Sequence, residues 1–408
     1  MSSDVSAKPE CIALLSAAFL PSAGQADSEI GALHHIAGSS LIGWQVAMLR
    51  DCGVATFLIE VDSVSGELLN AADSFRHDGA RVEFVRSAQE LQSFLTPDTR
   101  LIVQAEAHYF SAPIVADLTQ RTSTFIATID GRDENAGFER IDLNTRWAGF
   151  AALDAGTARS LMELPEGWSI TSSLLRHAVQ RGTAFLPIAQ GKLQDGDIAR
   201  ISTQADADAL AEHMLSARTS GATGLIERHV FGGIAKWLAP YIWSSRPGTK
   251  AVEISKFAFA FASLGCSAAG WIVAAAFTAL FATFLHMLAG VTGNFGDKVR
   301  HRSQKLLFWS ILAASALAAA LTIADFGQDT TPFVGVSIGL ILAAQKIGLP
   351  RWCAALLQSP ALVAFAMLVA AGFSVFAIGT KMIALAQVGL LVAGLYLPKI
   401  GIKNRNQA

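Results

Sequence analysis

The chain has 408 residues, of which 52% are hydrophobic and only 16% are charged. This exceeds the apolar content that one soluble core normally takes, so the composition excludes a single ordinary soluble domain. It predicts two units, one of which lies in lipid.

The charges divide the chain in the same way. Residues 1–224 contain 28 acidic and 16 basic side chains, whereas residues 225–408 contain 5 and 15. The basic charges flank apolar runs, which favours anionic lipid headgroups as partners and argues against nucleic acid. The four cysteines lie far apart without CxxC or Cys/His spacing, so we expect neither a zinc site nor a disulfide framework.

Short β-rich runs alternate with helical patterns through the first half. The runs are CIALLSAA (11–18), ATFLIEVD (55–62), RVEFVRS (81–87), RLIVQAE (100–106) and STFIATID (123–130). This alternation predicts a parallel sheet covered on both faces, which binds ligands beyond the carboxyl ends of its strands. We interpret the first run as a buried strand, with a signal anchor as the alternative, because the N-terminus lacks the basic start of a signal peptide.

An amphipathic helix precedes the apolar half. Between Gly221 and Gly248, apolar residues recur at three- and four-residue steps, and the pattern predicts a helix that ends near Pro240. The stripe consists of Ile226, Val230, Ile234, Trp237 and Tyr241. Its Trp and Tyr content favours a membrane-surface helix, and the alternative is a helix packed on the soluble domain.

Six membrane spans are predicted beyond this helix. They cover residues 252–268, 271–290, 306–324, 333–349, 360–379 and 382–398. Basic residues flank alternate loops, whereas the opposite loops contain only Asp325, Asp329 and Lys381 as charged residues. The positive-inside rule therefore predicts that both termini and the soluble domain lie in the cytoplasm.

This order of parts resembles a known fusion family. An α/β domain, an interfacial helix and six spans resemble proteins that join a nucleotidyltransferase domain to a CDP-alcohol phosphatidyltransferase domain, such as the bifunctional inositol-phosphate cytidylyltransferase and di-inositol-phosphate phosphate synthase. The resemblance implies a Rossmann-like, nucleotidyltransferase-like α/β domain over 1–219, an interfacial helix and linker over 220–248, and an all-α six-helix transmembrane domain over 249–408. It further implies the cytoplasmic (inner) membrane and a homodimer formed through the membrane domain.

The membrane half lacks the family's metal ligands. The family pattern DxxDGxxAR, followed after eight residues by GxxxDxxxD, supplies carboxylates to two metal ions. When Gly290 is aligned with the family glycine, the first two aspartates fall on His286 and Ala289. From Ala251 onward the only acids are Glu253, Asp297, Asp325 and Asp329. His286 and Asp297 remain the catalytic candidates for a modified polar pocket, and the alternative for His286 is helix packing.

The soluble half also departs from the family's nucleotide motifs. In the family that this half resembles, the nucleotide-binding loop follows the pattern AGxGTRL and is followed by a PKP segment. The corresponding stretch here is SAAFLPSAGQADSEIGALHH, and no lysine occurs between Lys8 and Lys192. Ser22 and Gly24 are the candidate nucleotide-binding residues of this loop. Glu106, at the end of the RLIVQAE run, is the candidate for both nucleotide and metal binding. We predict that Trp147 and Phe150 belong to the hydrophobic core, and the alternative is that they form an aromatic surface against which a sugar or inositol substrate packs.

Two functional hypotheses follow. The first is a divergent, catalytically degenerate family member that acts as a membrane scaffold or as a lipid or nucleotide sensor in phospholipid or polar-headgroup metabolism. The second is an active Mg²⁺-dependent transferase with a remodelled site that uses CTP or a CDP-alcohol. A transporter is disfavoured because intramembrane charge is nearly absent.

Overall fold

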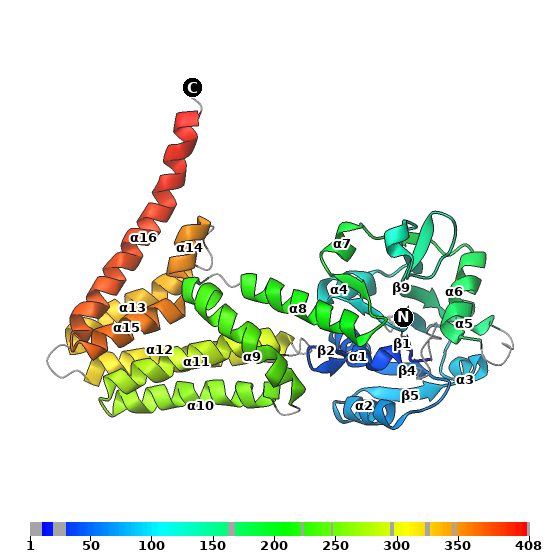
Figure 1. Ribbon diagram of the computed structural model, residues 1–408, viewed down its shortest axis with the longest axis horizontal. Helices are drawn as coiled ribbons and strands as arrows, with labels where there is room; N and C mark the ends of the chain where they lie inside the picture. The colour runs from blue at the N-terminus through cyan, green and yellow to red at the C-terminus, as the bar shows by residue number, and fades with distance from the viewer. Residues whose placement is uncertain are drawn as a thin grey trace, which may run out of the picture. The chain divides into compact units, whose positions relative to one another are not determined.

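A computed structural model of the chain describes residues 10–18, 30–161, 168–221, 224–245, 248–293, 298–322, 327–344, 347 and 349–405 (Figure 1). The chain divides into two compact units, with the boundary after His213. An α/β unit comes first and a helical unit follows, as the sequence predicted. Candidate sites Ser22, Gly24 and Asp297 lie outside the described residues.

The α/β unit is built on one seven-stranded sheet with the order β10-β8-β9-β6-β1-β4-β5. Its strands are β1 (Cys11–Ser16), β4 (Thr56–Glu60), β5 (Arg81–Val85), β6 (Arg100–Gln104), β8 (Phe125–Asp130), β9 (Thr145–Asp154) and β10 (Phe185–Pro187). The five predicted runs all form strands, because each is a short apolar segment that both faces of the sheet bury.

The predicted all-parallel sheet requires one correction. β9 runs antiparallel to both of its neighbours, β6 and β8, whereas the other pairs are parallel. β9 follows β8 directly along the chain and pairs with it, so no crossover helix separates the two strands. Trp147 and Phe150 of β9 are buried, which confirms them as core residues.

Helices cover both faces of the sheet. The larger ones are α1 (Leu41–Asp51), α2 (Gly66–His77), α3 (Ala88–Ser93), α4 (Ala112–Gln120), α5 (Ala155–Arg159) and α6 (Ile170–Gln180). Leu14 of β1 packs in a cluster with Leu91 of α3 and Leu174 of α6, and alternate residue Leu15 is equally buried on the other face. Serine side chains cap α1 and α2: Ser40 accepts from the Gly43 amide and Ser65 from the Leu68 amide, both at 3.2 Å.

Short elements complete this unit. They are the 3₁₀ turns η1 (Gly31–Leu33) and η2 (Asp133–Asn135), the strand pairs β2 (His35–Ile36) with β3 (Ser39–Ser40) and β7 (His108–Phe110) with β11 (Ile198–Arg200), and α7 (Gly191–Gln194). Helix α8 (Gln204–Ser220) follows β11.

The helical unit contains four helices that are long and apolar enough to cross a membrane. These candidate spans are Gly248–Ala268, Ile272–Thr292, Ser303–Thr322 and Phe376–Leu395. They belong to α10 (Gly248–Ala268), α11 (Ile272–Thr292), α12 (Lys298–Thr322) and α16 (Phe376–Arg405). The remaining helices are α13 (Gly327–Ala344), α14 (Arg351–Leu357) and α15 (Pro360–Gly372). Six spans are therefore not confirmed, because the apolar parts of α13 and α15 are shorter.

The last two predicted spans have the wrong boundary. The chain turns at residues 373–375, where Ser374 has a φ of 59°, and the expected loop around Gly379 and Lys381 lies inside α16. Gly379 serves packing instead of a turn, since a Cβ there would collide with the Ala370 side chain of α15.

The predicted amphipathic helix forms, with a different end. A π-helical turn, η3 (Glu227–Phe231), leads into α9 (Gly232–Ser244), which continues past Pro240. Phe231 and Ala235 pack against Phe284 and Leu288 of α11. Beyond the proline, Trp243 donates from Nε1 to the Thr292 carbonyl at 3.2 Å, which ties the end of α9 to the end of α11.

Candidate functional site

The switch point of the sheet lies between β1 and β6. The chain runs from β1 through β4 to β5 toward one edge of the sheet and then crosses back to β6, which pairs with β1 on its other side. In open α/β sheets, ligands bind in the crevice beyond the carboxyl ends of the two strands at this point. Here those ends are Ser16 of β1 and Gln104 of β6.

Glu106 lies two residues beyond β6, at the start of a sharp turn. The turn is made by Ala107, which has a φ of 58° and leads directly into β7. The Glu106 side chain is buried, and burial raises the pKa of its carboxyl from 4.5 to about 8. The charges of Glu60 and Asp62 raise this pKa further, while the backbone amides of Gly31 and Ala32 lower it. At neutral pH the Glu106 carboxyl is therefore mostly protonated.

Two buried glutamines hold the backbone of this turn. Gln45 of α1 donates from Nε2 to the carbonyls of Ala105 at 3.2 Å and His108 at 2.9 Å. Gln104 donates from Nε2 to the same His108 carbonyl at 3.3 Å. Because carbonyl oxygens only accept, these contacts fix which end of each amide is the NH₂ group. The Oε1 atoms of both glutamines have no partner among the described residues.

His108 completes the cluster as a neutral side chain. Its Nδ1 lies 2.5 Å from the Glu106 carbonyl and must donate to it, and burial lowers the pKa of the imidazole to about 4. The ring packs against Gly149, where the φ of +94° and the lack of space both require glycine. Nε2 is then an acceptor, and it also lacks a partner within the described part of the chain.

Four buried side-chain atoms of this cluster have no partner in the described part of the chain. Oε1 of Gln45, Oε1 of Gln104 and Nε2 of His108 are acceptors, whereas Oε1 of Glu106 can carry the proton of the neutral carboxyl and donate it. Buried polar atoms in folded proteins almost always have a partner, so such a group indicates a place that a ligand, an ion or a water completes. Chemically, the cluster fits a group that offers several N–H or O–H donors and one acceptor.

Glu60, at the carboxyl end of β4, has a different role although it is equally buried. Its carboxylate accepts from the Ile170 amide at 2.6 Å and the Thr171 amide at 3.1 Å, and also from the Thr171 hydroxyl. These groups form the first turn of α6, so Glu60 caps that helix across the sheet edge. Its oxygens are occupied and it is a structural residue.

A magnesium ion does not fit the described residues. No group of three His, Cys, Asp or Glu side chains is placed to hold a metal ion in the part of the chain that the structure describes. The described residues of this edge instead offer several unpaired hydrogen-bond acceptors.

His286, the catalytic candidate of the membrane half, lies in an aromatic stack. Its ring is parallel to Phe308 of α12, with centroids 4.3 Å apart, and meets Trp309 edge-on at 5.2 Å. This is a packing environment between α11 and α12. Glu106 and His286 belong to different compact units.

The sequence indicated Glu106 but not the residues that surround it. Gln45 stands within an apolar helix pattern, LIGWQVAML, and is buried in the structure. The sequence signal was a polar residue among apolar ones, which a helical wheel would have shown. Gln104 stands on an apolar strand, where an uncharged polar residue has no conspicuous pattern. Both were recognisable only as polar interruptions of buried segments.

Comparisons with known proteins give structural similarity alone. No family model matches the chain, and no curated protein matches it. Over its N-terminal half the chain is similar to a glucose-1-phosphate thymidylyltransferase, described as putative, from Bacillus anthracis, with 16% identity, a TM-score of 0.37 and coverage of 49% of this chain and 95% of that one. It is also similar to CTP:phosphocholine cytidylyltransferase from Streptococcus pneumoniae, with 14% identity, a TM-score of 0.36 and coverage of 50% and 98%.

Proposed function

We propose that this chain is a membrane-anchored nucleotide-binding protein that acts as a scaffold or sensor in phospholipid or polar-headgroup metabolism. In this proposal it is a divergent, catalytically degenerate relative of the nucleotidyltransferase and CDP-alcohol phosphatidyltransferase fusions. The observation that supports it most is the acceptor cluster around Glu106 at the switch point of the sheet.

The chemistry of the cluster favours binding over phosphoryl transfer. Transfer from a nucleoside triphosphate normally needs cations against the developing charge on phosphoryl oxygens. Among the described residues no group of three His, Cys, Asp or Glu side chains is placed to hold such a cation, and Glu60 is committed to the first turn of α6. The edge therefore suits the donor-bearing part of a nucleotide, such as a base amino group or the ribose hydroxyls, with CTP or a CDP-alcohol as the expected ligand.

The helical unit supplies the anchor in this proposal. Besides the candidate spans, α9 exposes an apolar face that includes Trp237 and Tyr241, which are 67% and 65% exposed. Lys236 and Arg228 are exposed on the same segment. Interfacial aromatic residues beside cations suit the headgroup layer of an anionic leaflet. We place α9 on the cytoplasmic surface of the inner membrane, with the α/β unit in the cytoplasm and a homodimer formed through the membrane domain.

Titration calorimetry of the full-length chain in lipid nanodiscs tests the proposal. CTP and a CDP-alcohol are titrated with and without Mg²⁺, and nucleotide turnover is followed in parallel. We expect nucleotide binding without turnover, and an affinity about tenfold weaker for Glu106→Leu, which removes both carboxyl oxygens, because roughly 1.4 kcal/mol is the scale of one hydrogen bond. Glu212→Leu is the matched control, since Glu212 is exposed on α8.

Two results would contradict this proposal in different ways. Absence of binding by every nucleotide would remove the ligand class altogether. Mg²⁺-dependent turnover that Glu106→Leu abolishes and Glu212→Leu preserves would show instead an active transferase with a remodelled site.

A further inference from the structure

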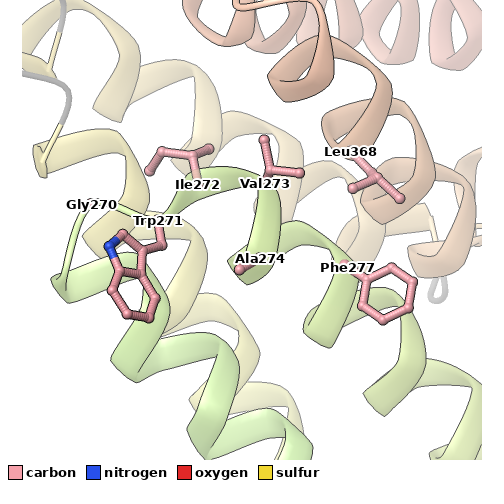
Figure 2. Close-up of a pocket in the computed structure, with 7 residues that line it drawn as sticks. All are labelled: Gly270, Trp271, Ile272, Val273, Ala274, Phe277 and Leu368. Atoms are coloured by element: carbon pink, nitrogen blue, oxygen red, sulfur yellow. The ribbon is translucent and has the colours of Figure 1, made fainter.

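The seam where α13 packs against α16 buries polar side chains. It differs from the groove beside the first turns of α11, which is open at the surface of the helical unit (Figure 2). Along the seam, buried residues recur on each helix at steps of three, four or seven residues, as in two helices that pack along their length. They are Thr330, Val334, Ser337 and Ala344 of α13, and Thr380, Ala384, Gln387 and Gly394 of α16.

The two helices run in the same direction along this seam. Near one end, Lys381 of α16 lies over the Phe333 ring of α13, with Nζ 5.7 Å from the ring centroid. Near the other end, Ala344 of α13 packs in one cluster with Leu390 and Leu391 of α16. Residue numbers therefore increase together on the two helices, and these contacts fix which residues lie at the same level.

Gln387 and Ser337 lie on the two facing stripes at nearly one level. Interpolation between the end contacts places them within about 4 Å of each other along the helix axes, at about 1.5 Å of rise per residue. The two residues are 5% and 3% exposed. Oε1 and Nε2 of Gln387 and Oγ of Ser337 have no hydrogen-bond partner among the residues that the structure describes. The two side chains therefore do not bond to each other directly.

Gln387 has no means of satisfying its amide on its own helix. Hydroxyl side chains do so, as when Thr380 donates to the Phe376 carbonyl at 2.7 Å. A glutamine has both a donor and an acceptor end, and the backbone amides inside α16 already bond within the helix. Burial of both ends without partners is costly, and more so where lipid surrounds the helices. The seam therefore indicates a bound molecule that both donates and accepts hydrogen bonds.

The depth of Gln387 excludes a lipid headgroup as that molecule. Gln387 lies about 17 Å from Phe376, where the candidate span Phe376–Leu395 begins. In a hydrocarbon layer about 30 Å thick, it is then roughly 15 Å from the headgroups on either side. The seam residue one turn before it, Ala384, has a short side chain, which keeps bulk away from the amide. Water is the smallest molecule with both donors and acceptors, and it is the usual partner of such buried groups.

We propose that the seam between α13 and α16 is a water-binding site within the hydrocarbon layer, where Gln387 and Ser337 hold one water molecule. The Gln387 amide and the Ser337 hydroxyl each bond to this water, which thereby joins the two helices. The site is independent of the nucleotide proposed for the α/β unit.

Radiolytic footprinting of the full-length chain in lipid nanodiscs tests this site. X-rays convert water to hydroxyl radicals, which oxidise the side chains beside that water, and mass spectrometry locates the products. The reporters are Ile341, one turn after Ser337, and Leu391, one turn after Gln387. We expect their oxidation to be roughly tenfold above that of Leu280, a half-buried leucine of α11, because a bound water generates radicals inside the seam.

Two variants distinguish the bound water from general access of solvent. Gln387→Leu removes both amide atoms at a similar side-chain volume and should reduce oxidation of Ile341 and Leu391 to the Leu280 level. Thr380→Val is the matched control, because it changes a buried hydroxyl of the same stripe that already bonds to its own helix. The control should leave the oxidation of both reporters unchanged.

The wild-type chain alone can overturn the proposal. Oxidation of Ile341 and Leu391 at the Leu280 level would show a dry seam, in which Gln387 and Ser337 bond directly after a small rotation of their side chains. Oxidation that Gln387→Leu leaves intact would place the water elsewhere. A retained organic molecule that native mass spectrometry detects, and that this variant loses, would replace water as the ligand.

Discussion

The interior of the α10–α12 bundle and the carboxyl edge of the sheet both bury polar side chains, but they differ in how many of those polar atoms have hydrogen-bond partners. In the bundle, Ser263 and Ser267 bond to Ser315 at 2.7 and 3.0 Å, and Ser263 lies 2.9 Å from the Ala275 carbonyl. At the sheet edge, the glutamines and His108 use their donors on the backbone and leave their acceptors without a partner in the described chain.

This difference separates packing from function. A polar group whose partners are all within the protein stabilises the fold and has little left for a ligand. Glu60 and Glu106 show the same contrast within one edge, because Glu60 is capped by three donors while Oε1 of Glu106 has none among the described residues.

The largest expected effect is a pH-dependent gain in stability for Glu106→Gln. Between pH 4.5 and 8 the folded chain holds a proton on Glu106 that the unfolded chain has lost, so the free energy of unfolding falls as pH rises. Over pH 5 to 8 this amounts to on the order of 4 kcal/mol. The variant removes the titration, and its stability relative to wild type should rise by that order across the same window. Calorimetry of the α/β transition at pH 5, 6.5 and 8 measures it.

Because His108 also titrates, the difference in stability between wild type and Glu106→Gln at each pH is more informative than the pH curve of either protein alone. Its depressed pKa means that the folded chain binds fewer protons than the unfolded chain between pH 4 and 6.5, so stability rises with pH there. The two effects oppose each other up to pH 6.5, and the Glu106 effect alone remains above it. Glu212→Gln should follow the wild-type curve, whereas parallel curves for wild type and Glu106→Gln would refute the raised pKa.

Glu60→Gln should cause the next largest change in the free energy of unfolding, a loss that is expected at any pH between 6 and 8. The amide removes the charge at the start of α6 and turns its NH₂ group toward donors, which costs about 3 kcal/mol. The melting temperature should fall by roughly 10 °C. Hydrogen exchange should increase first at Ile170 and Thr171. Glu67→Gln, at an exposed residue in the first turn of α2, should be nearly neutral. An equal loss in both variants would mean that the Glu60 contacts contribute little.

Local patterns predicted the strands but not all of their directions. The apolar runs at β1, β4, β5, β6 and β8 identified these strands, since a short buried run has the same signature in any sheet. β9 was not among the predicted runs. Its direction depends on how the chain returns to the sheet, and WAGFAAL carries no mark of that direction.

The candidate site was predicted in part for the same reason. A strand end marks Glu106, but the glutamines become significant only when the Ala105–His108 backbone folds between them. In the helical unit, the predicted fifth span ended at Gly379, whereas the structure uses this glycine for a close contact between helices. Glycine serves both turns and close contacts, and sequence alone does not separate these two uses. Tertiary packing decides between these uses.

Glu227→Gln should weaken the connection between the segment before α9 and the start of α15. The Glu227 carboxylate accepts from the Ser359 hydroxyl at 2.5 Å and from the Ala361 amide at 3.0 Å. Loss of this cap should cost about 1.4 kcal/mol and speed hydrogen exchange of the first turn of α15 about tenfold. Arg228→Gln changes an exposed neighbour and should leave this exchange rate unchanged. Unaltered hydrogen exchange in Glu227→Gln would show that the Glu227 hydrogen bonds do not stabilise the first turn of α15.

The smallest loss in the free energy of unfolding is expected for Ser315→Ala. Although Ser315 bonds to two serines, hydrogen bonds between membrane helices contribute only about 0.6 kcal/mol each, because the unfolded helices also find partners. Ser310→Ala is the control on the same helix, since Ser310 is exposed and its hydroxyl donates to the Leu306 carbonyl of its own turn. Unfolding of the full-length chain by titration with sodium dodecyl sulfate should show a loss for Ser315→Ala alone. A double-mutant cycle with Ser263→Ala should then show coupling. Additive losses would mean that the buried serines fill space without joining α10 to α12.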